Sequence, residues 1–292
     1  MALTSAQFER AAALESSQER LARLTRMSFG ALHALLAGDP VEAAGWVRCA
    51  AECGLSAAQL RLGRMLLDGS GVQRDEAAAF AWFARAAAQA DAAAMNMVGR
   101  CHENGWGVQV DLERAAASYR TSAEGGHDWG QYNFGNMLFD GRGVAPDRPQ
   151  ALRWYLRAAS SGHGRAMNMV GRSLEQGWGC RRSIEEAAYW YGESARCGYF
   201  RAQFNHALLL AERGQCDLAA EWFWQAAIGG GEPMRRAITR TLAAVAHPAL
   251  RQLRARVLER PRPATDRSSA NQGLRPATAA PGPAGGLLTP KR

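Results

Sequence analysis

The chain has 292 residues, of which 47% are hydrophobic and 21% are charged, a composition typical of folded globular proteins. No apolar run approaches the roughly 20 residues that a membrane-spanning helix needs. The N-terminus has Glu9 and Glu15 in place of the basic and apolar segments of a secretory signal. We therefore expect a cytoplasmic protein without a membrane span.

The net charge of +8 is concentrated at the C-terminal end. From Arg251 onward, nine Arg and Lys residues stand against Glu259 and Asp266, a net of +7 that leaves about +1 for residues 1–250. One alternative is therefore a basic tail that contacts nucleic acid or an anionic surface. The tail lacks the interleaved aromatic residues of single-strand binders. We favour a solubilising tail and do not expect nucleic acid as a partner.

A motif recurs every 36 residues along most of the chain. A small residue marks one column, at Gly63, Gly99, Gly135, Gly171 and Ala207. A bulky pair marks another, at Trp46-Val47, Trp82-Phe83, Ser118-Tyr119, Trp154-Tyr155, Trp190-Tyr191 and Trp222-Phe223. A fixed period of about 20–50 residues is typical of stacked supersecondary units.

One repeat illustrates what each unit contains. The apolar spacing predicts a helix over Ala57–Leu67, which Asp68–Gly71 ends, and a second helix over Asp75–Gln89. A helical hairpin of this kind cannot bury its apolar faces alone and must stack on a neighbour. We therefore predict an all-α fold, a right-handed α-α superhelix of about six stacked hairpins with helical caps.

The loop Asp140–Val144, followed by Ala151, Trp154-Tyr155 and Ala158-Ala159, carries the pattern most fully. This pattern resembles the Sel1-like repeat family, a longer-looped relative of the tetratricopeptide repeat, over about residues 28–230. The resemblance implies a non-enzymatic solenoid adaptor that binds other proteins. It carries over no catalytic residue and no cofactor, because the family motif is structural.

Departures from the repeat divide the chain. The loop glycine precedes the Trp column by 13 residues in the middle repeats but by eight in the end units, from Gly38 to Trp46 and from Gly214 to Trp222. Terminal repeats are expected to be atypical. Our predicted segments are N-terminal capping helices over 1–27, the solenoid over 28–231, C-terminal capping helices over 232–259, and a disordered basic Pro/Ala-rich tail over 260–292.

A second period of 72 residues lies on the first. The heptapeptide Ala94–Arg100 is repeated letter for letter at Ala166–Arg172, and each copy is followed by a Gly-Trp-Gly containing Trp106 or Trp178. These tryptophans either pack under the next hairpin or are exposed as anchors for a partner. A tandem duplication without a binding site is the simpler alternative.

Two columns on the first helix of each hairpin are polar while their neighbours are apolar. One column holds Arg64, Arg100, Asn136, Arg172 and Leu208, and the column three residues earlier holds Arg61, Met97, Asn133, Met169 and Asn205. We predict that this face is exposed, lines the concave groove and binds a protein or peptide segment with carboxylates. The predicted binding residues are Arg61, Arg64, Arg100, Asn133, Asn136, Arg172, Asn205, Trp106 and Trp178. The alternative is an ordinary solvated helix face.

No catalytic or metal-binding constellation is evident. Cys49 and Cys53 are four residues apart but lack a histidine at metal-ligand spacing, so we expect no metal site there. His102 and His206 fall in apolar columns, which favours partly buried structural histidines. An enzyme or enzyme subunit with a site in the groove is kept only as an alternative. The sequence makes no prediction of the oligomeric state.

Overall fold

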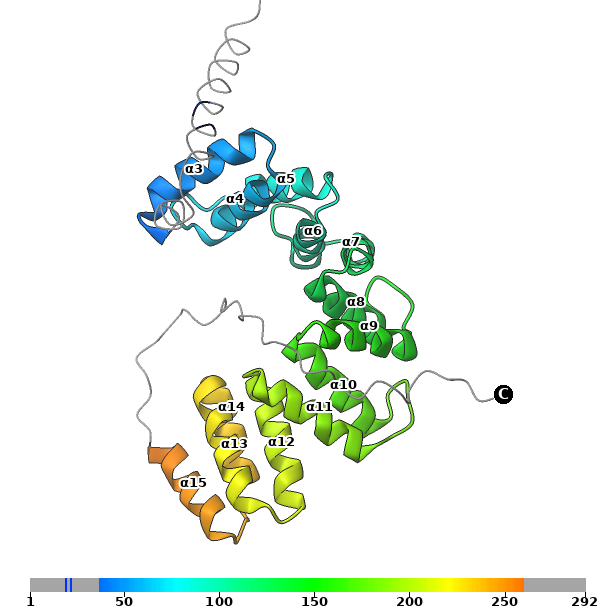
Figure 1. Cartoon of the computed structure of the whole chain (residues 1–292), viewed down its shortest axis with the longest axis vertical. Helices are drawn as coiled ribbons and strands as arrows, with labels where there is room; N and C mark the ends of the chain where they lie inside the picture. Colours follow the sequence, from blue (N-terminus) through cyan, green and yellow to red (C-terminus); the bar gives the residue numbers. More distant parts are fainter. Residues whose placement is uncertain (1–18, 20–21, 23–36, 260–292) are drawn as a thin grey trace, which may run out of the picture. The chain divides into compact units, whose positions relative to one another are not determined.

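The structure is a computed structural model that describes residues 19, 22 and 37–259. The predicted capping helices over 1–27 fall almost entirely outside the described residues, and the predicted disordered tail over 260–292 falls entirely outside them. The described residues form thirteen helices and no strand (Figure 1).

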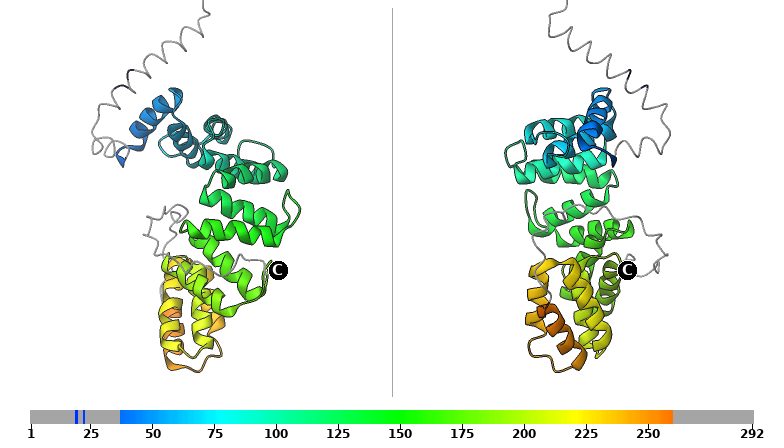
Figure 2. Two further views of the ribbon diagram at one scale, coloured as in Figure 1. Left: turned by 45° about the vertical axis from the view of Figure 1, so that its right-hand side comes forward. Right: turned by 90° about the vertical axis from the view of Figure 1, so that its left-hand side faces the viewer.

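The helices form consecutive hairpins. In chain order they are α3 (Pro40–Glu52), α4 (Ser56–Asp68), α5 (Glu76–Ala87), α6 (Ala92–Asn104), α7 (Leu112–Glu124), α8 (Asp128–Asp140), α9 (Arg148–Ser160), α10 (Gly164–Gln176), α11 (Ile184–Arg196), α12 (Phe200–Glu212), α13 (Cys216–Gly229), α14 (Gly231–Thr241) and α15 (Pro248–Glu259). The predicted helices over 57–67 and 75–89 correspond to α4 and α5. The two helices pack side by side in α4–α5, α6–α7, α10–α11 and α12–α13 (Figure 2). This hairpin repeat confirms the predicted all-α solenoid class.

The described residues divide into two compact units between Trp154 and Tyr155, a boundary that lies within α9. The 72-residue period places one copy of the repeated heptapeptide in each unit, on α6 and on α10. The two copies therefore provide two independent views of the same local arrangement.

Local sequence signals start and stop the helices. The carboxylates of Asp75, Asp91 and Asp111 accept hydrogen bonds from backbone N–H groups three residues on, which caps α5, α6 and α7. The first helix of a middle hairpin ends at a glycine in the left-handed conformation, as at Gly105, where φ is 78°. The second loop glycine has a packing role, because a Cβ atom on Gly107 would collide with the backbone of Glu76 at the start of α5.

The bulky pair has two different roles. Its second member is the core filler in every repeat: Val47, Phe83, Tyr119, Tyr155, Tyr191 and Phe223 are all at most 5% exposed. Its first member is only half-buried in each repeat. The small-residue column is explained by this filler, since a Cβ atom on Gly63, Gly99 or Gly171 would collide with the aromatic ring 20 residues later.

The ends of the second helices differ from the sequence expectation at one position. The position eight residues after the first member of the bulky pair holds Gly54, Ala90, Gly126, Gly162, Gly198 and Gly230, and glycine there favours a left-handed helix end. Five of these residues have positive φ, including Ala90 at 61°, but Gly230 has φ −97° and the positive φ moves to Gly231. The shift follows from the turn into α14, which begins directly after Gly230.

The last two helices cover the end of the repeat array within the second unit. Ile238 of α14 and Leu250, Leu253 and Val257 of α15 form one buried cluster with Phe223 of α13. Burying this apolar face removes it from water. This packing is what a C-terminal cap over 232–259 requires.

Candidate partner-binding face

The structure divides the predicted polar face into an exposed part and a half-buried part. Arg61, Arg64, Arg100 and Arg172 are exposed, whereas Asn133, Asn136 and Asn205 are half-buried. We call these seven residues the first-helix face. The expectation that the Met97 column points to solvent is wrong in part: Met97 is 4% exposed and belongs to the apolar core that contains Phe83.

In both copies of the heptapeptide, the arginine is held by a methionine and a tryptophan. The Arg100 Cζ atom lies 4.9 Å from the centroid of the Trp106 ring, and its Nη1 lies 3.7 Å from the Met97 sulfur. The second copy has the same arrangement. The Arg172 Cζ atom lies 5.1 Å from the Trp178 centroid, and its Nη1 lies 3.8 Å from the Met169 sulfur.

These contacts also address the two alternatives for the tryptophans. Trp106 and Trp178 are half-buried, and Trp106 packs against the apolar core. The face of each ring lies next to a guanidinium, where the ring quadrupole attracts the cation. Each tryptophan thus contributes to packing and positions an arginine.

Two asparagine pairs connect first helices of successive hairpins. Asn133 Nδ2 of α8 donates to Asn96 Oδ1 of α6 over 2.8 Å, and Asn205 Nδ2 of α12 donates to Asn168 Oδ1 of α10 over 3.0 Å. Asn96 and Asn168 are buried, at 5% and 4% exposure. Asn133 and Asn205, which we predicted as binding residues, therefore have a structural partner, since a buried amide needs one.

Each copy also contains a tyrosine–glutamate pair that the sequence reasoning missed. The Tyr119 hydroxyl donates to Glu103 Oε2 over 2.6 Å, and the Tyr191 hydroxyl donates to Glu175 Oε2 over 2.8 Å. Burial, followed by the hydrogen bond to the carboxylate, raises the pKa of both tyrosines far above the usual range. The signal that could have found these pairs is the 72-residue spacing, which relates both the glutamates and the tyrosines.

The arginines of the first unit lie close enough to influence one another. Loss of hydration, followed by the like charge of Arg100, lowers the pKa of the Arg64 guanidinium. Two neighbouring guanidinium groups concentrate positive potential on this part of the first-helix face. An anionic group is the chemistry that such a surface attracts.

His102 and His206 pack against aromatic rings. His102 is buried and meets the Phe80 ring edge-on, with centroids 5.5 Å apart. His206 packs edge-on to Trp222 at the same distance, and burial, then Arg196 and Arg213, lower its pKa. Across residues 19, 22 and 37–259, no three His, Cys, Asp or Glu side chains are grouped closely enough to hold a metal ion.

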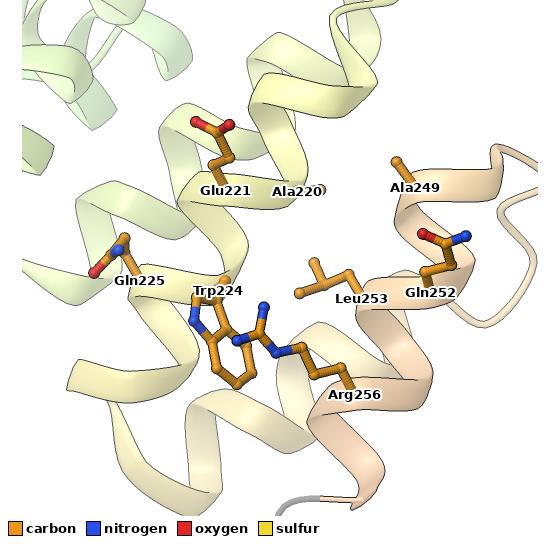
Figure 3. A pocket seen from close by; sticks show the side chains of 8 residues that line it. All are labelled: Ala220, Glu221, Trp224, Gln225, Ala249, Gln252, Leu253 and Arg256. Atoms are coloured by element: carbon orange, nitrogen blue, oxygen red, sulfur yellow. The ribbon is translucent and has the colours of Figure 1, made fainter.

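A surface hollow of about 430 Å³ lies between α13 and α15 (Figure 3). The guanidinium of Arg256 lies against the ring of Trp224, with Cζ 3.7 Å from the centroid. Among the described residues that line it, Glu221 is the one carboxylate, and there is no histidine, cysteine or serine. This lining lacks the paired acid and base or the nucleophile that catalysis uses.

The Sel1 repeat family model matches residues 16–55, 56–91, 92–127, 130–163 and 164–199, which together make up more than half of the chain. This chain belongs to the Sel1 repeat family. The first Sel1 match begins at residue 16, before the predicted start of the solenoid at residue 28. Proteins of the Sel1 repeat family generally act as scaffolds for protein–protein interactions.

Solved Sel1-type structures have the same fold. A Sel1 repeat protein from Oxalobacter formigenes is 25% identical, with a TM-score of 0.70, and the match covers 80% of this chain and 96% of that protein. A protective antigen of uropathogenic Escherichia coli that displays an SLR fold is 26% identical, with a TM-score of 0.63. That match covers 78% of this chain and 51% of the antigen, so the chain spans about half the length of that relative. No curated protein sequence matches this Sel1 repeat chain. Between residues 37 and 259, none of its helices is both long and apolar enough to cross a bilayer.

Proposed function

We propose that this Sel1 repeat protein is a non-enzymatic cytoplasmic scaffold that binds a carboxylate-bearing protein or peptide segment along the first-helix face, in the concave groove of the repeat array. The observation that carries the proposal is the repeated support of Arg100 and Arg172. Each is held by a methionine sulfur and a tryptophan ring in the same geometry, in two separate units.

This support matters because binding costs the entropy of ordering long side chains. A guanidinium that already lies on a tryptophan ring has lost part of its rotamer freedom before the partner arrives. It still presents donors for a forked hydrogen bond to a carboxylate. Arg100 and Arg172 are exposed, so their donors are accessible from solvent.

The remaining segments have supporting roles in this proposal. Helices α14 and α15 cap the array, and residues 260–292 act as a solubilising tail. The hollow between α13 and α15 offers no support for a catalytic role. Binding of nucleic acid or an anionic surface through the tail stays the alternative, since residues 260–292 lie outside the described residues.

The test is affinity capture from a lysate with the full-length chain, followed by mass spectrometry and a measured affinity for the captured protein. We expect the double variant Arg100→Glu, Arg172→Glu to bind at least about tenfold more weakly, because charge-assisted hydrogen bonds are lost and replaced by repulsion. The matched control is Arg120→Glu on α7, an exposed arginine of a second helix. Undiminished binding by the double variant would contradict the proposal.

A further inference from the structure

In two repeats, the middle residue of the Gly-x-Gly turn matches in chemistry a residue 39 positions earlier, near the end of the first helix of the preceding hairpin. Trp106 and Leu67 belong to the same apolar cluster. In the next repeat the pair is ionic, with Arg142 Nη1 lying 2.8 Å from Glu103 Oε1. In the Arg142 repeat, the turn thus places its middle side chain against the end of the previous first helix.

Glu175 stands at the same position in the second copy, and two of its neighbours repeat those of Glu103. One neighbour differs, because Arg182 Nε donates to the backbone carbonyl of Glu175 over 2.8 Å, whereas Val110 stands at the corresponding position after Glu103. A tyrosine hydroxyl holds Oε2 in both, and a supported arginine lies one turn earlier on the same helix, Arg100 before Glu103 and Arg172 before Glu175. Glu103 Oε1 accepts the guanidinium of Arg142. Within residues 37–259, Glu175 Oε1 has neither an ion-pair nor a hydrogen-bond partner.

The cause of this difference is the shortened last repeat. The residue 39 positions after Glu175 is Gly214, which has no side chain to reach back. The turn between α12 and α13 also lacks the Gly-x-Gly-Val loop, since α12 ends at Glu212 and α13 begins at Cys216. A half-buried carboxylate, oriented by Tyr191, is left without the cation that covers its counterpart.

We propose that Glu175 receives an arginine side chain of a partner protein, which takes the place that Arg142 occupies on Glu103. The inference rests on the proposed scaffold function in one respect, namely that the ligand is a segment of another protein. The chain itself supplies the template, because Arg142 shows that a guanidinium is accepted there even though Arg100 is supported one turn away.

The proposal also narrows the chemistry of the partner. Arg172 and Glu175 lie three residues apart on α10, so they occupy one side of the helix. A segment that satisfies both presents an acidic group to Arg172 and an arginine to Glu175. A purely acidic segment would leave Glu175 facing like charge, which costs affinity.

The probe is the chain's own loop, a capped synthetic peptide with the sequence of residues 141–147, Gly-Arg-Gly-Val-Ala-Pro-Asp. Its binding to the full-length protein is followed by the NMR shift of the Trp178 indole N–H. We expect saturable binding that weakens about tenfold in Glu175→Gln. Glutamine keeps one oxygen that can accept from Tyr191, removes the charge and replaces the other acceptor oxygen by an NH2 donor. A peptide with alanine in place of arginine is the matched control and is expected not to bind.

Three results would overturn the proposal: no binding to wild type, equal binding to Glu175→Gln, or binding that does not need the peptide arginine. A third protein tests whether the chain's own tail occupies the site. In this full-length variant the six Arg and Lys residues of 260–292 are replaced by glutamine. If the peptide binds this variant alone, the tail is the occupant and the partner assignment is wrong. None of these results depends on the Arg100 and Arg172 capture experiment, so the two proposals fail separately.

Discussion

Gly99 of α6 lies directly against the ring of Tyr119 of α7, so closely that a Cβ atom on Gly99 would be 2.7 Å from Tyr119 Cδ1. The same relationship recurs between Gly171 and Tyr191, also at 2.7 Å. Glycine is therefore needed in this column because the two helices of a hairpin approach so closely. It sets the depth at which the buried aromatic residue sits.

This contact predicts that Gly99→Ala destabilises the fold. The ring of Tyr119 is 1% exposed and its hydroxyl is bonded to Glu103, so it has little room to move. Overpacking of this kind costs about 1–3 kcal/mol of unfolding free energy, measurable by urea unfolding. Gly45→Ala in α3 is the control, because a Cβ there meets nothing within 4 Å. It should be neutral or stabilising, and equal losses in both variants would refute the packing explanation.

The asparagine pair between α6 and α8 predicts a coupling in a double-mutant cycle. Replacing Asn133 by alanine leaves the buried Asn96 Oδ1 without its donor, which costs about 1–3 kcal/mol. The double alanine variant should lose less than the sum of the two single variants. Chemical unfolding measures all three. The pair of Asn168 and Asn205 serves as an internal replicate, and strict additivity in both pairs would show that the bonds contribute nothing.

The buried tyrosines predict a loss of stability at alkaline pH. Burial raises the pKa of Tyr119 and Tyr191 in the folded state, so above about pH 10 the unfolded chain releases protons that the folded chain retains. Each tyrosine then lowers the unfolding free energy by about 1.4 kcal/mol per pH unit. The contribution is fully present below pH 10. We expect the double variant Tyr119→Phe, Tyr191→Phe to show a shallower decline in urea unfolding between pH 10 and 11.5, and an unchanged slope would contradict this origin.

The Cys101 thiol should be inert in the native protein. It is fully buried, and burial raises its pKa to about 12, so almost none is present as the reactive thiolate at neutral pH. Brief iodoacetamide treatment at pH 8, followed by mass spectrometry, should label Cys101 only after unfolding in urea. Cys216, which is half-buried, is the comparison within the same chain. Labelling of Cys101 at the rate of Cys216 would show that α6 opens readily.

Much of the fold could be predicted because its signals are local. The 36-residue period, the glycine stops and the acidic caps depend on residues within one hairpin, and α4 and α5 begin and end within two residues of the predicted bounds. The burial of Met97 could not be predicted equally well. A helix that packs on the helices before and after it buries a wider arc than an isolated hairpin would, so Met97 joined the core while Arg100 stayed exposed.

By itself, the sequence determined the repeat, the helical hairpins and the arginines of the first-helix face. Each of these follows from the spacing of residues along the chain. Only the tertiary structure decided what those residues touch. The support of Arg100 by Trp106, the bond between Asn133 and Asn96, and the ion pair of Arg142 with Glu103 all involve side chains brought together by folding. The two repeat copies are identical over seven residues, but the surroundings of Glu103 and Glu175 differ. Arg142 from the loop of the next hairpin pairs with Glu103, whereas the corresponding turn after Glu175 is shorter.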